Sequence, residues 1–294
     1  MRILTYTVTP EEDGRMVKGI LRGSLQLSYT LLKSLKWREN AILLNGQSVH
    51  VNAIVHAGDV VSVALSERTP REDLYCANAA KPDIVYEDDD LLVLNKPAGI
   101  AMHPKSGDAS ASSLAAMLTS YLGEGSVPHF VSRLDKGTSG LLIAAKNGYV
   151  HDRLRRALHS SDLRREYRAV AVGRVEPPCG VIDAPIGRAE GSIIRRCVRE
   201  DGLASRTEYE VLQTAERFSL LRLRPETGRT HQLRVHMAYL GHPLAGDWLY
   251  GTEDKNLIAR PALHSYKLWF TQPVTGQEMH FTAPIPQDMQ RLLE

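Results

Sequence analysis

The sequence predicts an α+β fold: a large domain with a mixed, mostly antiparallel sheet, flanking helices and a central cleft, and a small N-terminal α/β domain. Short alternating apolar segments separated by Gly, Pro and Asn turns recur from residue 84 onward, for example at 263–271 and 277–282. Helical patterns are few, and the clearest covers 150–158. The 294 residues, of which 43% are apolar, are enough for one large core and one small second domain.

The N-terminal part has the pattern of a separate small domain. Helices are predicted at 16–22 and 29–35, and the dipeptide Asn45-Gly46 marks a hairpin turn between short strands. The predicted strands are 41–44, 48–54 and 60–65.

A linker is predicted at 67–82, where charged residues, small residues and a proline follow one another without a helical or strand period. The predicted domains are therefore 1–66 and 83–294. Within the second domain, the stretch 105–108 lacks the spacing of a phosphate-cradling loop, so we expect no nucleotide site there.

Composition and charge exclude several classes of protein. No window approaches eighteen consecutive apolar residues, and the N-terminus has no basic segment followed by an apolar one, so we expect a cytoplasmic protein without a membrane span. Cys76, Cys179 and Cys197 are odd in number and lack C-x-x-C spacing, so we expect packing residues and no disulfide framework. A net charge of +2 is too small to indicate nucleic-acid binding, so any basic surface must be local.

Arginines gather on the polar face of the predicted 150–158 helix and in the segment after it. They are Arg153, Arg155, Arg156, Arg164, Arg165 and Arg168. Because Asp152, Asp162 and Glu166 dilute this charge, the residues alone support contact with RNA phosphates and a solvated face equally.

Three histidines, His231, His236 and His242, fall on or just after a predicted helix at 231–240. Their spacings of five and six residues do not place them on one helix face, so we expect no metal site. Arg234 lies beside the apolar stripe of this helix, where a cation can stabilise a partly buried carboxylate.

The stretch 129–146, HFVSRLDKGTSGLLIAAK, predicts a strand, a tight turn and a second strand. Asp135 lies at the mouth of the turn, and an apolar run at 141–145 leaves it. Taken alone, an Asp at this place is more often a turn-former than a catalytic group.

The turn sequence RLDKGTSG at 133–140 is similar to the signature of the RNA pseudouridine synthases of the large-subunit-ribosomal A-type family, in which the Asp is catalytic. Two further stretches agree with this resemblance: VLNKPAGIAMHP at 93–104 and RPETGRTHQLRVHMAYLGHPLAGDWLYG at 224–251. One position departs from it, because the family usually has His where this chain has Ser132. The resemblance covers nearly everything from Ile84 to the C-terminus.

This resemblance implies isomerisation of uridine to pseudouridine in structured ribosomal or transfer RNA, a reaction that needs no cofactor. It implies that Asp135 is the catalytic carboxylate, that Tyr167 stacks on the target base and that Arg234 pairs with Asp135. Arg133 is implied to fill the place that the flipped base leaves, and we expect Arg229 to contact RNA or a loop of the protein. The sequence leaves open whether Asp135 attacks the sugar, attacks the base or removes a proton.

The predicted helices and turns of the first domain resemble the S-four-type RNA-binding domain of ribosomal proteins. The resemblance suggests that Lys33, Lys36 and Arg38 bind RNA phosphates, although a solvated face explains three cations almost as well. RNA is the expected partner of a monomeric protein with no membrane contact.

Two alternative functions remain at the level of sequence. A carboxylate-dependent nucleoside or glycoside hydrolase needs a second acid about 5 to 10 Å from Asp135, and Asp247 is the candidate. A non-catalytic RNA-binding protein would be expected to lack Asp135, Tyr167 or Arg234, and all three are present.

Overall fold

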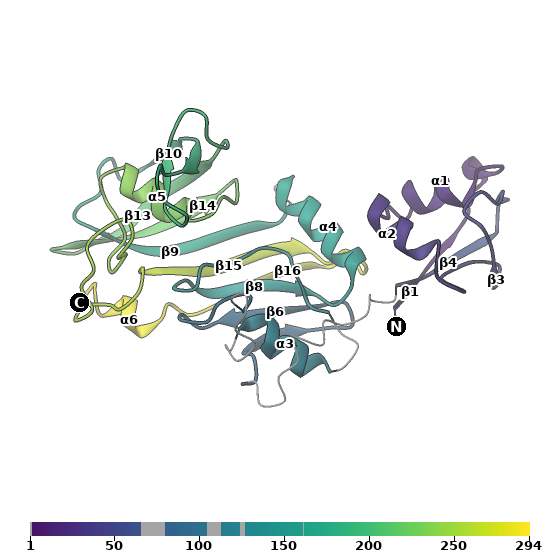
Figure 1. The fold of residues 1–294 in the computed structure, drawn as a ribbon, viewed down its shortest axis with the longest axis horizontal. Helices are drawn as coiled ribbons and strands as arrows, with labels where there is room; N and C mark the ends of the chain where they lie inside the picture. Colours follow the sequence, from purple (N-terminus) through teal and green to yellow (C-terminus); the bar gives the residue numbers. More distant parts are fainter. Residues whose placement is uncertain (1, 66–79, 105–112, 124–126, 161) are drawn as a thin grey trace.

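The computed structural model contains a four-stranded sheet before the predicted linker and a ten-stranded and a two-stranded sheet after it (Figure 1). The structure describes residues 2–65, 80–104, 113–123, 127–160 and 162–294. Most of the predicted linker, together with Cys76 and the stretch 105–108, lies outside the described residues.

The N-terminal part forms a four-stranded sheet in the order β1-β4-β2-β3, with two helices beside it (Figure 1). Its elements are β1 (Arg2–Thr7), α1 (Val17–Arg22), α2 (Tyr29–Leu35), β2 (Ile42–Leu44), β3 (Gln47–Ser48) and β4 (Val60–Leu65). Both predicted helices are confirmed, and Ser28 caps α2 by accepting a hydrogen bond from the Leu31 amide. The sequence analysis did not predict β1.

The predicted strand at 48–54 is wrong beyond Ser48, where β3 ends. The backbone of this segment is used differently, because the carbonyls of Val51 and Ala53 accept hydrogen bonds from the Lys18 and Val17 amides, both at 2.8 Å. These amides belong to the first turn of α1 and have no partner within the helix. The segment therefore completes the helix N-terminus instead of extending the sheet.

The C-terminal part is built on a ten-stranded sheet, and a separate two-stranded hairpin lies beside it. The large sheet runs β10-β13-β14-β9-β15-β8-β6-β5, with β16 paired to β15 and β7 to β8. Its strands are β5 (Ile84–Glu87), β6 (Leu91–Lys96), β7 (His129–Phe130), β8 (Ser139–Ala145), β9 (Arg164–Val172), β10 (Cys179–Asp183), β13 (Arg206–Thr214), β14 (Phe218–Pro225), β15 (Leu263–Thr271) and β16 (Glu278–Thr282), and the hairpin is β11 (Ile186–Arg188) with β12 (Arg196–Val198). Among the described pairs only β8 and β15 are parallel, so the predicted mixed, mostly antiparallel sheet is confirmed.

Helices cover both faces of the large sheet, because successive strand residues point to opposite sides. Leu91 and Val93 pack with α4 (Gly148–His159), whereas Leu92 and Leu94 pack with α3 (Leu114–Leu122) and α5 (Gln232–Tyr239). The C-terminal hairpin β15–β16 is confirmed, and the helix predicted after it is the short α6 (Gln287–Gln290). α3 was not predicted.

A glycine allows β8 to lie close to β15. Gly140 has a φ of 107°, and a Cβ atom there would lie 2.2 Å from the Ser265 carbonyl oxygen. The pair is also fixed by the buried hydrogen bond between Ser139 Oγ and His264 Nδ1 at 2.9 Å. Burial lowers the pKa of His264 to about 4, so this ring is neutral at pH 7. The contacts between β8 and β15 therefore fix the turn that precedes β8.

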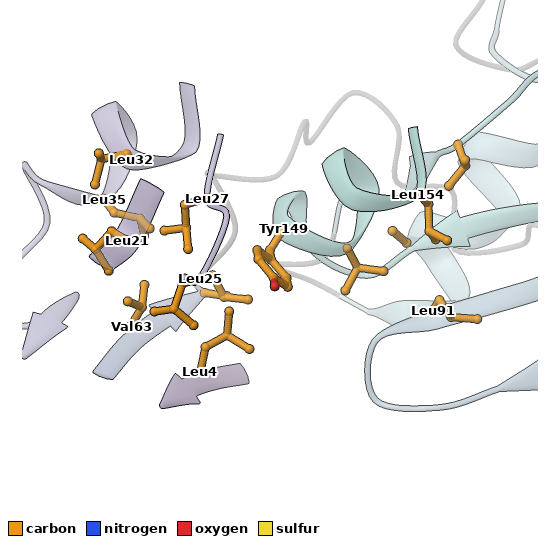
Figure 2. Packing of buried hydrophobic residues seen from close by; sticks show 14 of the residues in the cluster. Leu4, Leu21, Leu25, Leu27, Leu32, Leu35, Val63, Leu91, Tyr149 and Leu154 are labelled. Carbon is orange, nitrogen blue, oxygen red and sulfur yellow. The ribbon is translucent and has the colours of Figure 1, made fainter. Parts of the chain in front are cut away.

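The two parts of the chain share an apolar interface. One continuous cluster of buried residues runs from Leu25 and Leu27 in the N-terminal domain to Tyr149 and Leu154 of α4 (Figure 2). Arg2 of β1 adds an ion pair with the buried Asp90 at 3.3 Å. The N-terminal part therefore lies against α4, at one end of the large sheet (Figure 1).

The cysteine prediction is wrong for Cys179, which is exposed on the edge strand β10. Cys197 is half-buried in β12, and neither is in a disulfide. Within the described part of the chain, no helix is long and apolar enough to cross a membrane.

Candidate active site

The turn that carries Asp135 connects β7 to β8, which confirms the predicted strand, turn and strand. The Thr138 amide donates to the Asp135 carbonyl at 3.0 Å and closes the turn. The Asp135 side chain lines a cavity and is 29% exposed. A carboxylate in this place is both fixed by the turn and accessible to a ligand.

The turn opens into a cavity of about 470 Å³, a volume typical of ligand pockets. All five residues predicted for this domain line it, namely Arg133, Asp135, Tyr167, Arg229 and Arg234. They come from three places in the sequence: the β7–β8 turn, β9, and the segment from 229 into α5. The fold therefore brings the second and third motifs together with Tyr167 in one cavity, whereas no residue of the first motif, 93–104, lines it.

Arg234 is the buried cation of this cavity, only 5% exposed on α5. Its main partner is Asp247, to which Nε and Nη2 each donate at 2.7 Å. Its Nη1 reaches Asp135 Oδ2 at 3.4 Å, a longer contact. The predicted pairing of Arg234 with Asp135 is thus present, but the two-pronged contact is made to a different carboxylate.

The partner of Arg234 is itself fully enclosed. Asp247 is 0% exposed, and its Oδ1 also accepts from the Leu249 amide at 3.1 Å. Burial by itself lowers the pKa of Arg234, but the bonds to Asp247 and the charge of Asp135 hold that pKa above its ordinary value. The guanidinium is therefore a permanent cation with a fixed orientation.

This arrangement bears on the hydrolase alternative. One guanidinium binds both carboxylates, which places Asp247 within about 10 Å of Asp135, the range of two-carboxylate enzymes. However, Asp247 has no exposed surface and both of its oxygens accept hydrogen bonds. It has no access to a substrate, so it does not supply the second acid that a hydrolase requires.

His231 and Tyr250 form a second support of the site. His231 precedes α5 with a φ of 60°, a strained conformation for a residue other than glycine, and its Nδ1 is hydrogen-bonded to the Tyr250 hydroxyl at 2.8 Å. Burial lowers the pKa of His231, although the charge of Asp135 by itself raises it. Asp135 Oδ1 lies 3.9 Å from His231 Nε2. The Tyr250 ring covers the Arg234 guanidinium at 5.0 Å and restricts its movement.

Lys96 is a second buried cation, 1% exposed at the end of β6. Its Nζ donates to the carbonyls of Pro97, Ile100 and Lys136 at 2.8, 2.9 and 3.3 Å. Burial lowers the pKa of Lys96 to about 8, although the charge of Asp135 opposes the shift. Because Lys136 directly follows Asp135, this bond ties the first motif to the turn.

The remaining predicted residues lie at different depths. Tyr167 of β9 is 5% exposed and packs with Leu134 in the cluster beneath the cavity. Arg133 is exposed at the cavity mouth. Arg229 is half-buried, and its Nε donates to the Ala204 carbonyl at 3.1 Å. The arrangement places an apolar ring and a carboxylate inside, with cations around the opening.

The three cations predicted to bind RNA from the N-terminal domain are not part of this cavity. Lys33 lies on α2, and Lys36 and Arg38 follow its end. Between them Trp37 is 79% exposed, with the Lys36 Nζ 4.9 Å from its ring centroid. The sequence analysis missed Trp37, although an exposed indole between cations is a feature of surfaces that stack bases.

The three histidines considered for a metal site have separate partners. His236 is hydrogen-bonded to Thr207 Oγ1 and the Ala184 carbonyl, and His242 to the Val172 carbonyl. In the described ranges, no group of three or more His, Cys, Asp or Glu residues is placed to hold a metal ion.

Sequence reasoning missed Lys96, Tyr250 and the true function of Asp247 in the site. An Asp in the mainly apolar stretch 244–250 is a signal that was available, because a buried carboxylate requires a cationic or amide partner. The lysine that ends the apolar strand β6 is a similar signal.

The fold and the site define a protein with a cavity in which a partly exposed carboxylate lies beside a buried arginine. A family model described as RNA pseudouridylate synthase matches residues 90–239, which include the turn, β9 and α5. The chain belongs to this family of RNA-modifying isomerases.

Relatives and solved structures agree with this assignment. The chain is 39% identical to an uncharacterized RNA pseudouridine synthase of Bacillus subtilis, over 92% of this chain and 96% of the relative. It is 39% identical to ribosomal large subunit pseudouridine synthase D of Vibrio cholerae, over 97% and 92% of the two chains. The structure of human RNA pseudouridylate synthase domain containing 1 covers 74% of this chain and 86% of its own, with a TM-score of 0.58 and 27% identity.

Proposed function

We propose that this enzyme converts specific uridines of large-subunit ribosomal RNA to pseudouridine, with Asp135 as the catalytic carboxylate. The observation that carries the proposal is the partly exposed Asp135 carboxylate, which lies 3.4 Å from the buried Arg234 in the lining of one cavity. The names of several relatives from Vibrio species and from Salmonella typhimurium support ribosomal RNA as the substrate class, since they are ribosomal large subunit synthases.

The reaction moves a base on its own ribose. The bond between N1 and C1′ breaks, the base turns, C5 bonds to C1′, and C5 loses the proton that N1 in effect gains, so atoms and charge balance without a redox partner. A carboxylate beside a fixed guanidinium is suited to such chemistry. Asp135 provides that carboxylate, and the pre-set geometry of Arg234 and Asp247 avoids reorganisation during the reaction.

Tyr167 and Arg133 have complementary functions in this proposal. The target base must leave its stack to reach Asp135. Tyr167, which lines the cavity, offers it a ring to stack on, and Arg133 at the mouth fills the place that the base leaves in the RNA. Arg229, also on the cavity wall, contacts the backbone of the same strand.

We propose that residues 1–66 form an S-four-like RNA-binding domain, linked by 67–82 to the catalytic domain at 83–294. The exposed Trp37 beside Lys36 supports this assignment, because stacking on an aromatic ring combined with nearby positive charge is a common mode of RNA binding. Lys33 and Arg38 extend the positive charge along the same segment. Reduced affinity of Trp37→Ala for structured ribosomal RNA, with an unchanged fold, is the expected result, and equal affinity would contradict it. The monomeric state and the cytoplasmic location stay predictions.

The decisive experiment compares wild type with Asp135→Asn on a transcript of large-subunit ribosomal RNA, with pseudouridine mapped at each nucleotide. The variant keeps the shape of the side chain and loses the anion, so we expect a loss of at least about a thousandfold in turnover with little change in RNA binding. Asp89→Asn, whose side chain is 90% exposed, is the matched control. Undiminished turnover in Asp135→Asn would refute the role of this residue, and modification of transfer RNA alone would correct the substrate class.

A further inference from the structure

A second groove, of about 440 Å³, adjoins the active-site cavity. Both are lined by Gly228, Arg229 and Thr230, so this turn forms the wall between them. The opposite wall comes from the β11–β12 hairpin and the residues after it, and its lining includes Arg188, Arg196, Asp201 and Leu203. An RNA strand that leaves the active-site cavity over this turn enters the groove directly.

The groove has an excess of unpaired positive charge. Arg188, Arg196 and Arg229 line it, and none of them forms an ion pair with a carboxylate among the described residues. The one acidic residue in its lining, Asp201, is bound through both oxygens by the guanidinium of Arg199. The groove therefore attracts anions, and its cations remain available to them.

The β11–β12 hairpin is fixed to the active site by packing and by hydrogen bonds. β12 packs against α5, and the Arg196 amide donates to the Tyr250 hydroxyl at 2.9 Å. The same hydroxyl is hydrogen-bonded to His231, which lines the active-site cavity. On the other wall, the bond from Arg229 Nε to the Ala204 carbonyl holds that guanidinium between the two cavities. The distance between groove and catalytic carboxylate is thus fixed.

We propose that this groove binds the RNA phosphates next to the target uridine, so that Arg188, Arg196 and Arg229 hold the strand while the base is in the cavity. The proposal rests on the proposed function and specifies where the substrate strand leaves the active site. Leu203, 62% exposed in the groove lining, gives the sugar or base of that neighbouring nucleotide an apolar surface. Among anions, a polynucleotide fits best, because the groove is continuous with a cavity that takes one nucleotide of a chain.

The test measures binding of fluorescent single-stranded oligouridylates of three and nine nucleotides to the full-length protein. The variant is Arg188→Gln/Arg196→Gln, and the control is Arg217→Gln/Arg291→Gln, which removes the same charge at two exposed arginines that line neither cavity. Arg217 precedes β14, at the opposite end of that strand from the turn at 228–230. Circular dichroism and thermal melting check that each variant is folded.

We expect wild type to bind the nine-mer more tightly than the trimer. The affinity of the groove variant should fall about tenfold for the nine-mer and stay unchanged for the trimer. Loss of two phosphate contacts lowers the slope of log affinity against log salt by about 1.4. The proposal is overturned if wild type binds both lengths equally, or if the control loses as much affinity for the nine-mer as the variant does. It is also overturned if uridine monophosphate is as effective as the trimer in competing with the nine-mer at the groove. Binding does not require turnover, so failure of catalysis and failure of the groove are distinguishable.

Discussion

The floor and the mouth of the active-site cavity both carry positive charge, but they hold it in opposite ways. The floor is defined here as Arg234, which lines the cavity, together with the enclosed Lys96 and Asp247, which do not line it themselves. These residues are at most 5% exposed, and every charge among them has a fixed partner. Arg234 is bound at two nitrogens by Asp247, and Lys96 donates to three carbonyls.

The mouth, defined here as Arg133, Arg155 and Arg229, is open to solvent in whole or in part. Within the described ranges, none of the three forms an ion pair with a carboxylate. Their guanidinium groups keep their charge for a ligand that arrives from outside.

The buried and the exposed cations of this one site therefore have two different tasks. Charges buried with fixed partners act on the reacting atoms, since they need no rearrangement when the substrate binds. Exposed cations without partners act on affinity, since they release counterions when RNA phosphates replace them. Changes to the floor should therefore alter turnover and stability, and changes to the mouth should alter affinity and its dependence on salt.

The largest effect is expected for Asp247→Asn. The variant keeps the side-chain shape but removes the carboxylate that holds Arg234, and a buried arginine that loses its partner costs about 3 to 5 kcal/mol in the free energy of unfolding. The guanidinium then turns toward Asp135 as its only remaining carboxylate, which weakens Asp135 as a base or nucleophile. We expect turnover to fall at least about a hundredfold with RNA affinity nearly unchanged.

Asp288→Asn is the matched control for this change. Asp288 also binds an arginine through two oxygens, Arg260 at 2.7 and 2.8 Å, but its side chain is 42% exposed. Exposed pairs of this kind contribute about 1 kcal/mol or less. Urea unfolding and turnover at saturating RNA compare the two variants, and a wild-type result for Asp247→Asn would mean that Arg234 is held well enough by Tyr250 and the helix.

A smaller effect on the floor concerns Lys96 and pH. Because the pKa of Lys96 is about 8 in the folded protein and 10.5 is its ordinary value, the unfolded chain binds more protons between these pH values. The free energy of unfolding should therefore rise with pH across this window, by up to about 3 kcal/mol, as the folded state no longer holds a buried charge. Below pH 8 both states are protonated and the contribution does not change.

The difference in unfolding free energy between wild type and Lys96→Met, measured in urea at pH 7, 8, 9 and 10, isolates this contribution. It should be flat from pH 7 to 8 and then increase. Lys255→Met, which removes a side chain that is 72% exposed, serves as the control and should show a much weaker trend. A difference that stays constant up to pH 10 would show that Lys96 remains charged in the folded protein.

Local sequence patterns predicted the fold class and most elements, because each follows from a local property. α2 has its cap residue Ser28, α4 has its apolar stripe of Val150 and Leu154, and β15–β16 has its Pro and Gly turn. The failures are segments whose backbone pairs with something distant. The strand predicted at 48–54 instead completes the N-terminus of α1, a contact that no local period encodes.

The same division between local and distant contacts applies to the site. Asp135, Tyr167 and Arg234 were predicted from a family resemblance, and the structure places all three in one cavity, although their functions stay proposals. The sequence signals that a buried Asp247 needs a partner, but it does not identify Arg234 as that partner, because the loop that carries Asp247 reaches the guanidinium only when α5 and the segment after it have folded. The structure, not the pattern, shows that the carboxylate considered as a second acid instead anchors the arginine.

The smallest effect is expected at the mouth, and neighbouring residues of α4 provide the test. Arg155 lines the cavity, is exposed and forms no ion pair among the described residues. Arg156 is the next residue, is also exposed, and pairs with Asp152 one turn earlier. The two variants Arg155→Gln and Arg156→Gln therefore remove the same charge from the same helix, but only the first removes a cation from the mouth.

If the mouth cations bind RNA phosphates, Arg155→Gln should raise the KM for ribosomal RNA about fivefold and lower the slope of log affinity against log salt by about 0.7 to 0.9, the value for one phosphate contact. Its kcat should stay within about twofold of wild type, because the floor is intact. Arg156→Gln should change KM by less than about twofold, since a cation already paired with Asp152 has less to offer a phosphate. Equal losses in the two variants would mean that α4 attracts RNA by its total charge alone. A fall in kcat for Arg155→Gln would place Arg155 with the floor and remove the distinction between the two regions.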